Sequence, residues 1–207
     1  QITESFSNFS YKKMIDKKNK IILDSNDIPE NYKYYWNYQY VLGENSIYPY
    51  LAKFNAFKEN YSVLEIGSAE GGVLHALGLN GAGKLIGTDI AQDRIDMGKK
   101  ISDLLGLNTE YFIHDIINDE IPEEWKNQFD LILLRDVIEH LEDTDKALSN
   151  IRKLLKKEGF LFVTFPPYPS PFGGHQHTIG SSAGKLPYIH LLPKTIFHQL
   201  IKSGRPQ

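Results

Sequence analysis

The sequence contains no cysteine. This absence excludes disulfide bonds, metal sites built on thiolates and catalysis by a thiol nucleophile, and it is typical of a reducing compartment, so we expect a cytoplasmic protein. No apolar run approaches the ~20 residues that a membrane-spanning helix needs. The first residues are polar and carry several lysines, unlike a secretory signal peptide. We therefore expect no contact with a membrane.

The sequence also lacks a strong excess of charge of either sign. Its formal net charge is -3 over 207 residues, whereas nucleic-acid-binding surfaces are usually strongly basic. We therefore expect no nucleic-acid partner. The length allows one α/β domain with a full hydrophobic core.

The chain opens with a polar stretch, followed by a segment rich in tyrosine. Residues 31–54, NYKYYWNYQYVLGENSIYPYLAKF, predict one or two short helices. These helices either pack on the edge of a sheet or form an aromatic lid over a ligand. We therefore divide the chain into residues 1–60, a lead-in with an aromatic helical lid, and residues 61–207, the main domain.

From residue 62 onward, apolar runs alternate with amphipathic segments. This alternation predicts an α/β fold with a doubly wound, mainly parallel sheet. The predicted strands are 62–67, 84–90, 109–115, 129–136 and 160–167, and the predicted helices are 71–79, 91–105, 143–159, which ends at a glycine, and 193–204. In such sheets, ligands bind beyond the carboxyl ends of the strands, so functional residues are expected at the strand ends.

The first strand leads into the sequence SVLEIGSAEGGVL, residues 62–74. Its glycines, Gly67 among them, allow a sharp turn and a close approach of the main chain to a ligand. A dinucleotide-binding turn would carry G-x-G-x-x-G, but Ala69 replaces the second glycine here. Glu65 and Glu70 would repel a pyrophosphate and suit a cationic ligand. The alternative is a tight turn between strand and helix with no ligand.

The second and third strand ends each carry an aspartate. Asp89 follows the glycine-rich turn at the spacing of an acid that accepts hydrogen bonds from ribose hydroxyls, although it also suits the N-cap of the next helix. Asp115 is placed to accept a hydrogen bond from an adenine amino group, with Ile90 and Ile116 on the two faces of the ring. The alternative for Asp115 is an aspartate that only starts the following turn.

The fourth strand ends in LLRDVIEHLED. Arg135 and Asp136 leave the strand, and Glu139 and His140 follow. If a helical turn begins at Asp136, then Asp136, Glu139 and His140 share one face, because residues three and four apart are neighbours on a helix. That face would point into the crevice at the strand ends.

Taken together, these strand ends resemble the class I (Rossmann-like) S-adenosyl-L-methionine-dependent methyltransferases from about residue 45 to the end. The motif RDVIEHL is similar to the sub-group that includes ubiquinone-pathway and sugar or natural-product O-methyltransferases. The resemblance implies S-adenosyl-L-methionine as cofactor. It implies that the cofactor contacts the turn with its methionine part, Asp89 with its ribose, Asp115 and Ile116 with its adenine, and Arg135, Asp136 and Val137 near its sulfonium. The cofactor-binding residues of the turn and the strand before it are Glu65, Gly67, Ser68, Ala69 and Gly71, and Ile90 is added as an adenine contact.

The family's sheet normally ends with an antiparallel hairpin of two strands. In this chain the predicted helix 193–204 precedes the place of that hairpin, and the sequence then stops. We therefore expect a sheet that lacks the hairpin or is completed by sequence outside this chain.

Transfer of a methyl group to a hydroxyl or amine requires a base that removes a proton. His140 is the first candidate, with a structural histidine as the alternative. The segment 165–193 is too long for an ordinary connection, and its His175 and His177 are further candidates for a base or an acceptor-binding group. We assign no metal, although Asp136, Glu139, His140 and a loop histidine together would suit Mg²⁺, Mn²⁺ or Zn²⁺.

We therefore predict a methyltransferase that acts on a small-molecule acceptor, at oxygen of a sugar, a phenol or another biosynthetic intermediate. The alternative is a non-catalytic methyltransferase-like module that binds ligand within a larger assembly. A nicotinamide-dependent dehydrogenase is disfavoured by Ala69 and Glu70. The sequence does not indicate an oligomeric state.

Overall fold

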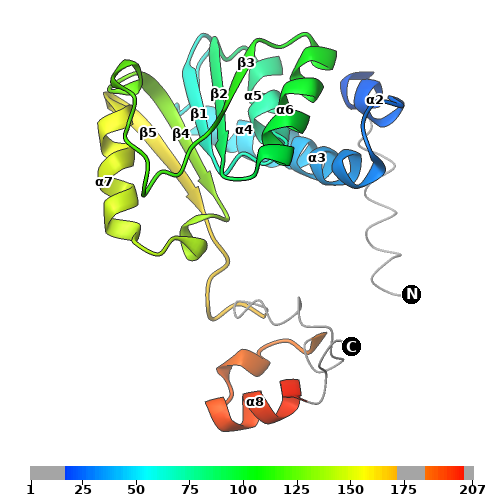
Figure 1. Cartoon of the computed structure of the whole chain (residues 1–207), viewed down its shortest axis with the longest axis vertical. Coiled ribbons are helices and arrows are strands. Elements are labelled where there is room, and N and C mark those ends of the chain that lie inside the picture. The colour runs from blue at the N-terminus through cyan, green and yellow to red at the C-terminus, as the bar shows by residue number, and fades with distance from the viewer. Residues whose placement is uncertain (1–16, 172–184, 203–207) are drawn as a thin grey trace. The chain divides into compact units, whose positions relative to one another are not determined.

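A computed structural model of the chain describes residues 17–171 and 185–202 (Figure 1). The chain divides into two compact units, residues 1–163 and residues 164–207, and each is described by itself. The first unit holds the sheet and the helices that cover it.

The sheet has five strands in the order β3-β2-β1-β4-β5. Neighbours β1 and β2, β1 and β4, and β2 and β3 all pair in parallel. The strand order reverses between β1 and β4, which is where such sheets bind ligands. The predicted doubly wound, mainly parallel sheet is thus confirmed. The strands are β1 (Ser62–Ile66), β2 (Lys84–Asp89), β3 (Thr109–Ile113), β4 (Phe129–Arg135) and β5 (Leu155–Thr164).

Helices cover both faces of the sheet, as Figure 1 shows. The helices that the structure describes are α2 (Lys17–Leu23), α3 (Glu30–Leu42), a π-helix (Gly43–Ile47), α4 (Tyr48–Lys53), α5 (Gly72–Leu79), α6 (Gln92–Leu105) and α7 (Thr144–Leu154) in the first unit and α8 (Lys194–Lys202) in the second. Short 3-10 turns lie at Glu123–Trp125, Ile138–His140 and Ile189–Leu191.

The core forms because the central strands are apolar on both faces. Along β1, Val63 packs in a buried cluster with Leu74 of α5, whereas Leu64 packs in a separate cluster with Ile151 of α7. Successive side chains of a strand point to opposite faces, so one strand contributes to both clusters. β1 is therefore packed on both faces, and this packing fixes the position of the residues at its carboxyl end.

The predicted helix 143–159 is too long. The structure ends α7 at Leu154 and begins β5 at Leu155. The carbonyls of Lys153 and Leu154 accept backbone hydrogen bonds from Asn127 and Gln128, at 2.9 and 3.0 Å. Contacts with the segment before β4 therefore end the helix, in place of the glycine that the sequence pattern indicated.

The aromatic segment 31–54 packs mainly against α5. Trp36 and Tyr40 are buried and stacked, with ring centroids 5.0 Å apart. A Cβ atom on Gly72 would lie 2.5 Å from the carbonyl oxygen of Trp36. The two helices therefore approach closely because Gly72 has no side chain. Most of α3 thus packs on another helix and not on a sheet edge. Tyr35 also reaches the cavity described below, so the lid stays a prediction.

The second unit contains α8 and the turn before it. His190 is buried, and its Nε2 lies 2.6 Å from the carbonyl oxygen of Tyr168. His175 and His177 fall in the segment 172–184, outside the described residues. Among the helices that the structure describes, none has the length and apolar character to cross a membrane.

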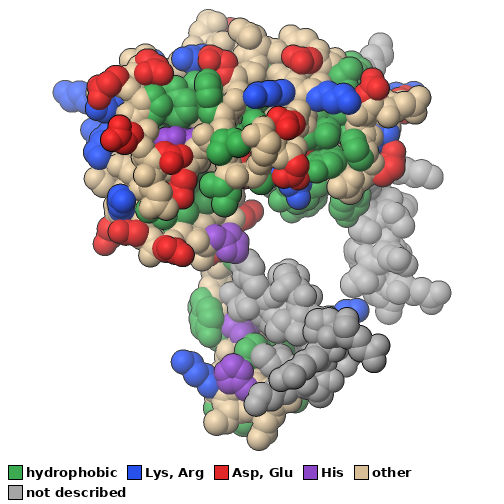
Figure 2. All heavy atoms as spheres, viewed as in Figure 1, with side chains coloured by type: hydrophobic (Ala, Val, Ile, Leu, Met, Phe, Trp, Pro, Cys, Tyr) green, Lys and Arg blue, Asp and Glu red, His purple; other side chains and the backbone are tan. Residues whose placement is uncertain are grey.

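Figure 2 shows the outer atoms of the molecule. On the face in view, acidic and basic side chains are interspersed over the first unit, and apolar side chains gather in patches between them. This mixed surface agrees with the small net charge of the sequence.

Candidate functional site

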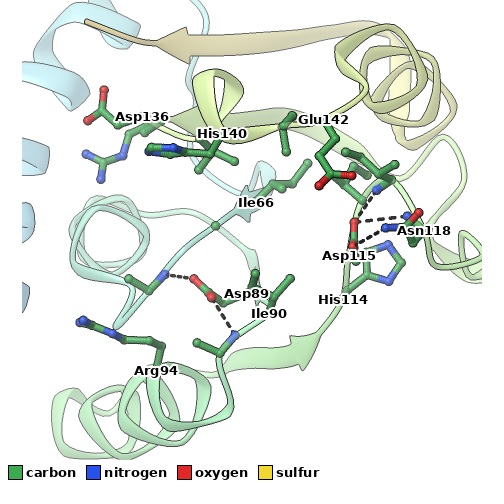
Figure 3. A pocket seen from close by; sticks show the side chains of 18 of the residues that line it. Ile66, Asp89, Ile90, Arg94, His114, Asp115, Asn118, Asp136, His140 and Glu142 are labelled. Atoms are coloured by element: carbon green, nitrogen blue, oxygen red, sulfur yellow. Dashed lines mark hydrogen bonds between the residues drawn. The ribbon is translucent and has the colours of Figure 1, made fainter. Parts of the chain in front are cut away.

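A cavity of about 580 Å³ opens at the carboxyl ends of β1, β2, β3 and β4 (Figure 3). Its size is typical of a small-molecule site. The predicted residues that line it are Gly67, Ala69, Asp89, Ile90, Asp115, Ile116, Arg135, Asp136, Val137 and His140. Glu65, Ser68 and Gly71 do not line it. The strand ends thus meet where the sequence predicted, although their roles in binding stay predictions.

The turn after β1 has the left-handed backbone that its glycines allow. Gly67, Ala69 and Gly71 have φ angles of +68°, +48° and +75°. A Cβ atom on Gly67 would lie 2.4 Å from Cγ2 of Val137. Glycine is therefore required here by close packing against the β4 loop as well as by the turn itself, whereas Ala69 adopts a conformation that is unfavourable for its side chain.

Asp89 fixes this turn to the end of β2. Its two carboxylate oxygens accept hydrogen bonds from the backbone N–H groups of Ala69 and Ala91, each at 2.9 Å (Figure 3). Asp89 is not the N-cap of α6, because that position is held by Ala91. A carboxylate has about four lone-pair sites, so Asp89 can still accept hydrogen bonds from a ligand in the cavity.

Asp115 organises the loop after β3. It accepts hydrogen bonds from the backbone N–H of Ile117 at 2.8 Å and from the side-chain amide of Asn118 at 2.9 Å. The bond from Ile117 is the main reason that the pKa of Asp115 is lowered. Asp115 therefore starts a turn, as the alternative held, and also lines the cavity.

Glu65 lies beneath the cavity, in the core. Its Oε1 accepts a hydrogen bond from Nε of Arg135 at 3.0 Å, and its Oε2 accepts one from the backbone N–H of Leu74 at 3.2 Å. Burial raises the pKa of Glu65, against the opposing effect of Arg135. The buried ion pair joins β1 to β4 at the switch point, so Glu65 is placed to position Arg135.

Glu70 is also buried and forms an ion pair with Arg94 of α6. Burial raises the pKa of Glu70. Arg94 lines the cavity and was not predicted from the sequence. Both acids of the first turn are therefore paired with arginines.

The loop after β4 forms the rim of the cavity. Asp136, which lines the cavity, has a left-handed φ angle of +52°. The exposed side chain of His140 follows on a 3-10 turn, and Glu142 lines the same rim. Within residues 17–171 and 185–202, no three His, Asp or Glu side chains are close enough to hold a metal ion. A site that includes His175 or His177 lies outside these residues.

Several cavity residues were missed by the sequence analysis. Tyr35 and Gln39 come from α3, far from the strand ends in sequence. For Tyr35 the available signal was the aromatic segment 31–54, whereas Gln39 gave none. His114 and Asn118 flank Asp115, so their closeness to that predicted residue was the available signal. His114 is buried, its Nε2 has no hydrogen-bond partner in the described structure, and burial lowers its pKa.

The chain matches the model of a known protein family and is similar in sequence to several characterised proteins. A family model for a methyltransferase domain matches residues 57–179. Ubiquinone biosynthesis O-methyltransferase from Coxiella burnetii is 31% identical over 132 residues, which cover 64% of this chain and 53% of that protein. Phosphoethanolamine N-methyltransferase 2 from Caenorhabditis elegans is 26% identical over 136 residues, which cover 61% of this chain and 30% of that protein. The chain spans about half or less of the length of these curated relatives.

Solved structures share the fold. A SAM-dependent methyltransferase from Aquifex aeolicus has a TM-score of 0.51 and 21% identity, with 72% of each chain covered. The YcgJ protein from Bacillus has a TM-score of 0.54 and 17% identity, with 74% of this chain and 65% of that chain covered. The predicted fold and methyltransferase family are confirmed by these comparisons, and with the family its cofactor, S-adenosyl-L-methionine.

Proposed function

The chain belongs to the methyltransferase-domain family, and from this premise we propose that it transfers a methyl group from S-adenosyl-L-methionine to an oxygen atom of a small molecule. The observation that carries the proposal is the meeting of four strand ends around one cavity. When bound, the cofactor supplies a methyl group activated by its sulfonium. The 31% identity to a ubiquinone biosynthesis O-methyltransferase supports oxygen as the acceptor atom.

The lining of the cavity fits this cofactor. Ile90 is 75% exposed, so an apolar side chain is available at the cavity for the face of an adenine ring. Asp89 is placed to accept hydrogen bonds from ribose hydroxyls. The two arginines of the lining, Arg94 and Arg135, are each paired with a glutamate. The lining also carries the carboxylates of Asp89, Asp115, Asp136 and Glu142. These would repel the two negative charges of a pyrophosphate, whereas S-adenosyl-L-methionine carries no phosphate, so a nicotinamide cofactor fits less well.

The rim of the cavity provides the acceptor side of the proposed reaction. His140 is placed to remove the proton of an acceptor hydroxyl at one of its ring nitrogens, and general-base catalysis of this kind contributes roughly 10²–10⁴-fold. The rigid strand ends hold the reacting groups in position, and positioning can contribute about 7–11 kcal/mol to a barrier. His175 and His177 stay predicted contributors to the acceptor site.

Transfer of a labelled methyl group from S-adenosyl-L-methionine to a panel of phenols, sugars and amines tests the proposal. We expect a labelled product from at least one hydroxyl acceptor. We expect His140→Gln to lower that rate by about 10²–10⁴-fold. The control Asp103→Asn, at an exposed position near the far end of α6, should leave the rate unchanged.

Two results would contradict the proposal. Labelled products from amines alone would show that the acceptor atom is nitrogen. Binding of the cofactor without a labelled product from any acceptor would favour the alternative, a methyltransferase-like module that binds ligand without catalysis.

A further inference from the structure

Two arginines line the cavity, and they differ in what they offer a ligand. The side chain of Arg135 is 7% exposed and is hydrogen-bonded to the buried Glu65. The side chain of Arg94 is 37% exposed and lies on the cavity rim. Among the described lining residues, Arg94 is therefore the cation that a bound ligand can reach.

Arg94 is held in place before any ligand binds. Its guanidinium forms an ion pair with Glu70 and lies 5.4 and 5.3 Å from the ring centroids of Tyr32 and Tyr35. The hydroxyl of Tyr32 donates to the carboxylate of Asp93 at 2.8 Å, which ties α3 to the start of α6. An arginine has five N–H donors in a fixed plane, and Glu70 accepts from one nitrogen only. The remaining donors are therefore oriented and available.

The position of Arg94 in the cavity indicates which part of a ligand it meets. Figure 3 shows Arg94 on one side of Asp89, and Asp115 with Asn118 on the other. If the ribose lies at Asp89 and the adenine at Asp115, the amino-acid part of the cofactor extends along the turn that contains Ala69, toward Arg94. That part ends in a carboxylate.

We propose that Arg94 binds the α-carboxylate of S-adenosyl-L-methionine and that Glu70 positions the Arg94 guanidinium for this contact. The proposal rests on the proposed function, because it assumes the same cofactor in the same cavity. Arginine matches a carboxylate with two parallel, charge-assisted hydrogen bonds. The rings of Tyr32 and Tyr35 limit the freedom of the guanidinium, so less entropy is lost when the carboxylate binds.

Two ligands separate this contact from the rest of the site. S-adenosylhomocysteine carries the amino-acid group, and 5′-methylthioadenosine has the same adenosine but lacks that group. Calorimetric titration with both ligands should be made on the native chain, on Arg94→Met and on Glu70→Gln/Arg94→Met. The double variant is needed because Arg94→Met alone leaves a buried carboxylate without its partner. Thermal unfolding shows whether each variant is folded.

We expect the double variant to bind S-adenosylhomocysteine about 10–100-fold more weakly, since hydrogen bonds to charged groups contribute that much, and to bind 5′-methylthioadenosine unchanged. Arg152→Met, at an exposed arginine of α7, is the matched control and should change neither affinity. An equal loss for both ligands, or no loss for either, would overturn the Arg94 assignment alone. Failure of the native chain to bind S-adenosylhomocysteine would overturn the proposed function and this assignment with it.

Discussion

At the scale of single residues, the cavity is built on buried charges that neutralise each other. Glu65 and Arg135 are 1% and 7% exposed in their side chains, and their atoms lie 3.0 Å apart. Taking two charges out of water is costly, so such a pair is stable only while both members are present. The contribution of the ion pair to the free energy of unfolding is therefore measured by comparing a variant that lacks one member with a variant that lacks both.

We predict that Arg135→Met lowers the free energy of unfolding by about 3–5 kcal/mol, because it leaves the buried Glu65 carboxyl group without its ion-pair partner. Glu65→Gln/Arg135→Met removes both charges and should be markedly less destabilising. Urea unfolding followed by tryptophan fluorescence measures this, since both tryptophans, Trp36 and Trp125, lie in the first unit. A double variant as unstable as Arg135→Met would show that the unpaired Glu65 carboxyl group is not the cause of the lost stability.

His75 makes the stability of the first unit depend on pH. Its Nδ1 accepts a hydrogen bond from the indole N–H of Trp36 at 2.9 Å, so its proton sits on Nε2, which lies 2.7 Å from the Tyr111 hydroxyl. Burial lowers the pKa of His75 to about 3. The folded protein therefore keeps this imidazole neutral at pH values where the unfolded chain, with a histidine pKa of about 6.5, binds a proton.

Because the unfolded state binds more protons, stability falls as the pH drops below about 6.5 and continues to fall toward the folded pKa. We predict a loss of about 2 kcal/mol from His75 between pH 7.5 and pH 5. Urea unfolding of the native chain and of His75→Gln at both pH values isolates this contribution, because His114 and the carboxyl groups are common to both. Equal pH dependence in the two proteins would contradict the prediction.

Ala69 occupies a backbone conformation that favours glycine. Its φ angle is +48°, and its N–H is hydrogen-bonded to Asp89. We predict that Ala69→Gly raises the free energy of unfolding by up to about 1 kcal/mol, because relief of the left-handed strain exceeds the entropy gained by the unfolded chain. Chemical denaturation measures the change. A loss of stability would mean that the alanine methyl group contributes packing that outweighs the strain.

At the scale of elements, the wall of the cavity depends on how closely α3 approaches α5. Gly72 donates its backbone N–H to the Gln39 side chain at 3.2 Å, and Gln39 lines the cavity. A Cβ atom on Gly72 would lie 2.5 Å from the carbonyl oxygen of Trp36 and 2.8 Å from the amide nitrogen of Tyr40. Both of these atoms are backbone, so only a shift of the whole helix relieves the contact.

We predict that Gly72→Ala lowers the free energy of unfolding by about 1–3 kcal/mol, as overpacking does, and displaces Tyr35 and Gln39 from the cavity. Gly78→Ala on the same helix is the comparison, because the nearest atoms to its Cβ are side-chain atoms, Cδ1 of Leu85 at 2.5 Å among them, and alanine favours a helix. Urea unfolding of the two variants compares them directly. Equal destabilisation would show that α3 adapts to the added methyl group.

The elements were predictable from the sequence where a local pattern determines them. The apolar runs of β1 and β4, together with Asp89 at the end of β2 and Asp115 after β3, placed the site at the strand ends. The length of α7 was not predictable, because hydrogen bonds from Asn127 and Gln128 end it. The pairing of Glu70 with Arg94 was missed for the same reason, since contacts between distant residues leave no periodic signal.

At the scale of the whole molecule, the cavity is formed by residues 35–142, inside the first unit. The cofactor side of the proposed function therefore depends on this unit. The motifs at the strand ends are shared by a family whose members bind the same cofactor, so the cofactor could be predicted from the sequence. The identity of the acceptor depends on the shape of a pocket, which a sequence motif does not encode.

The most direct test of the central proposal is a calorimetric titration of the native chain with S-adenosylhomocysteine, beside Asp89→Asn and the exposed control Asp96→Asn. We predict saturable one-to-one binding by the native chain and by Asp96→Asn, and binding at least about 10-fold weaker in Asp89→Asn, which loses a charge-assisted contact with the ribose. Absence of binding by the folded native chain, or equal affinity in all three proteins, would contradict the assignment of this cavity to the cofactor.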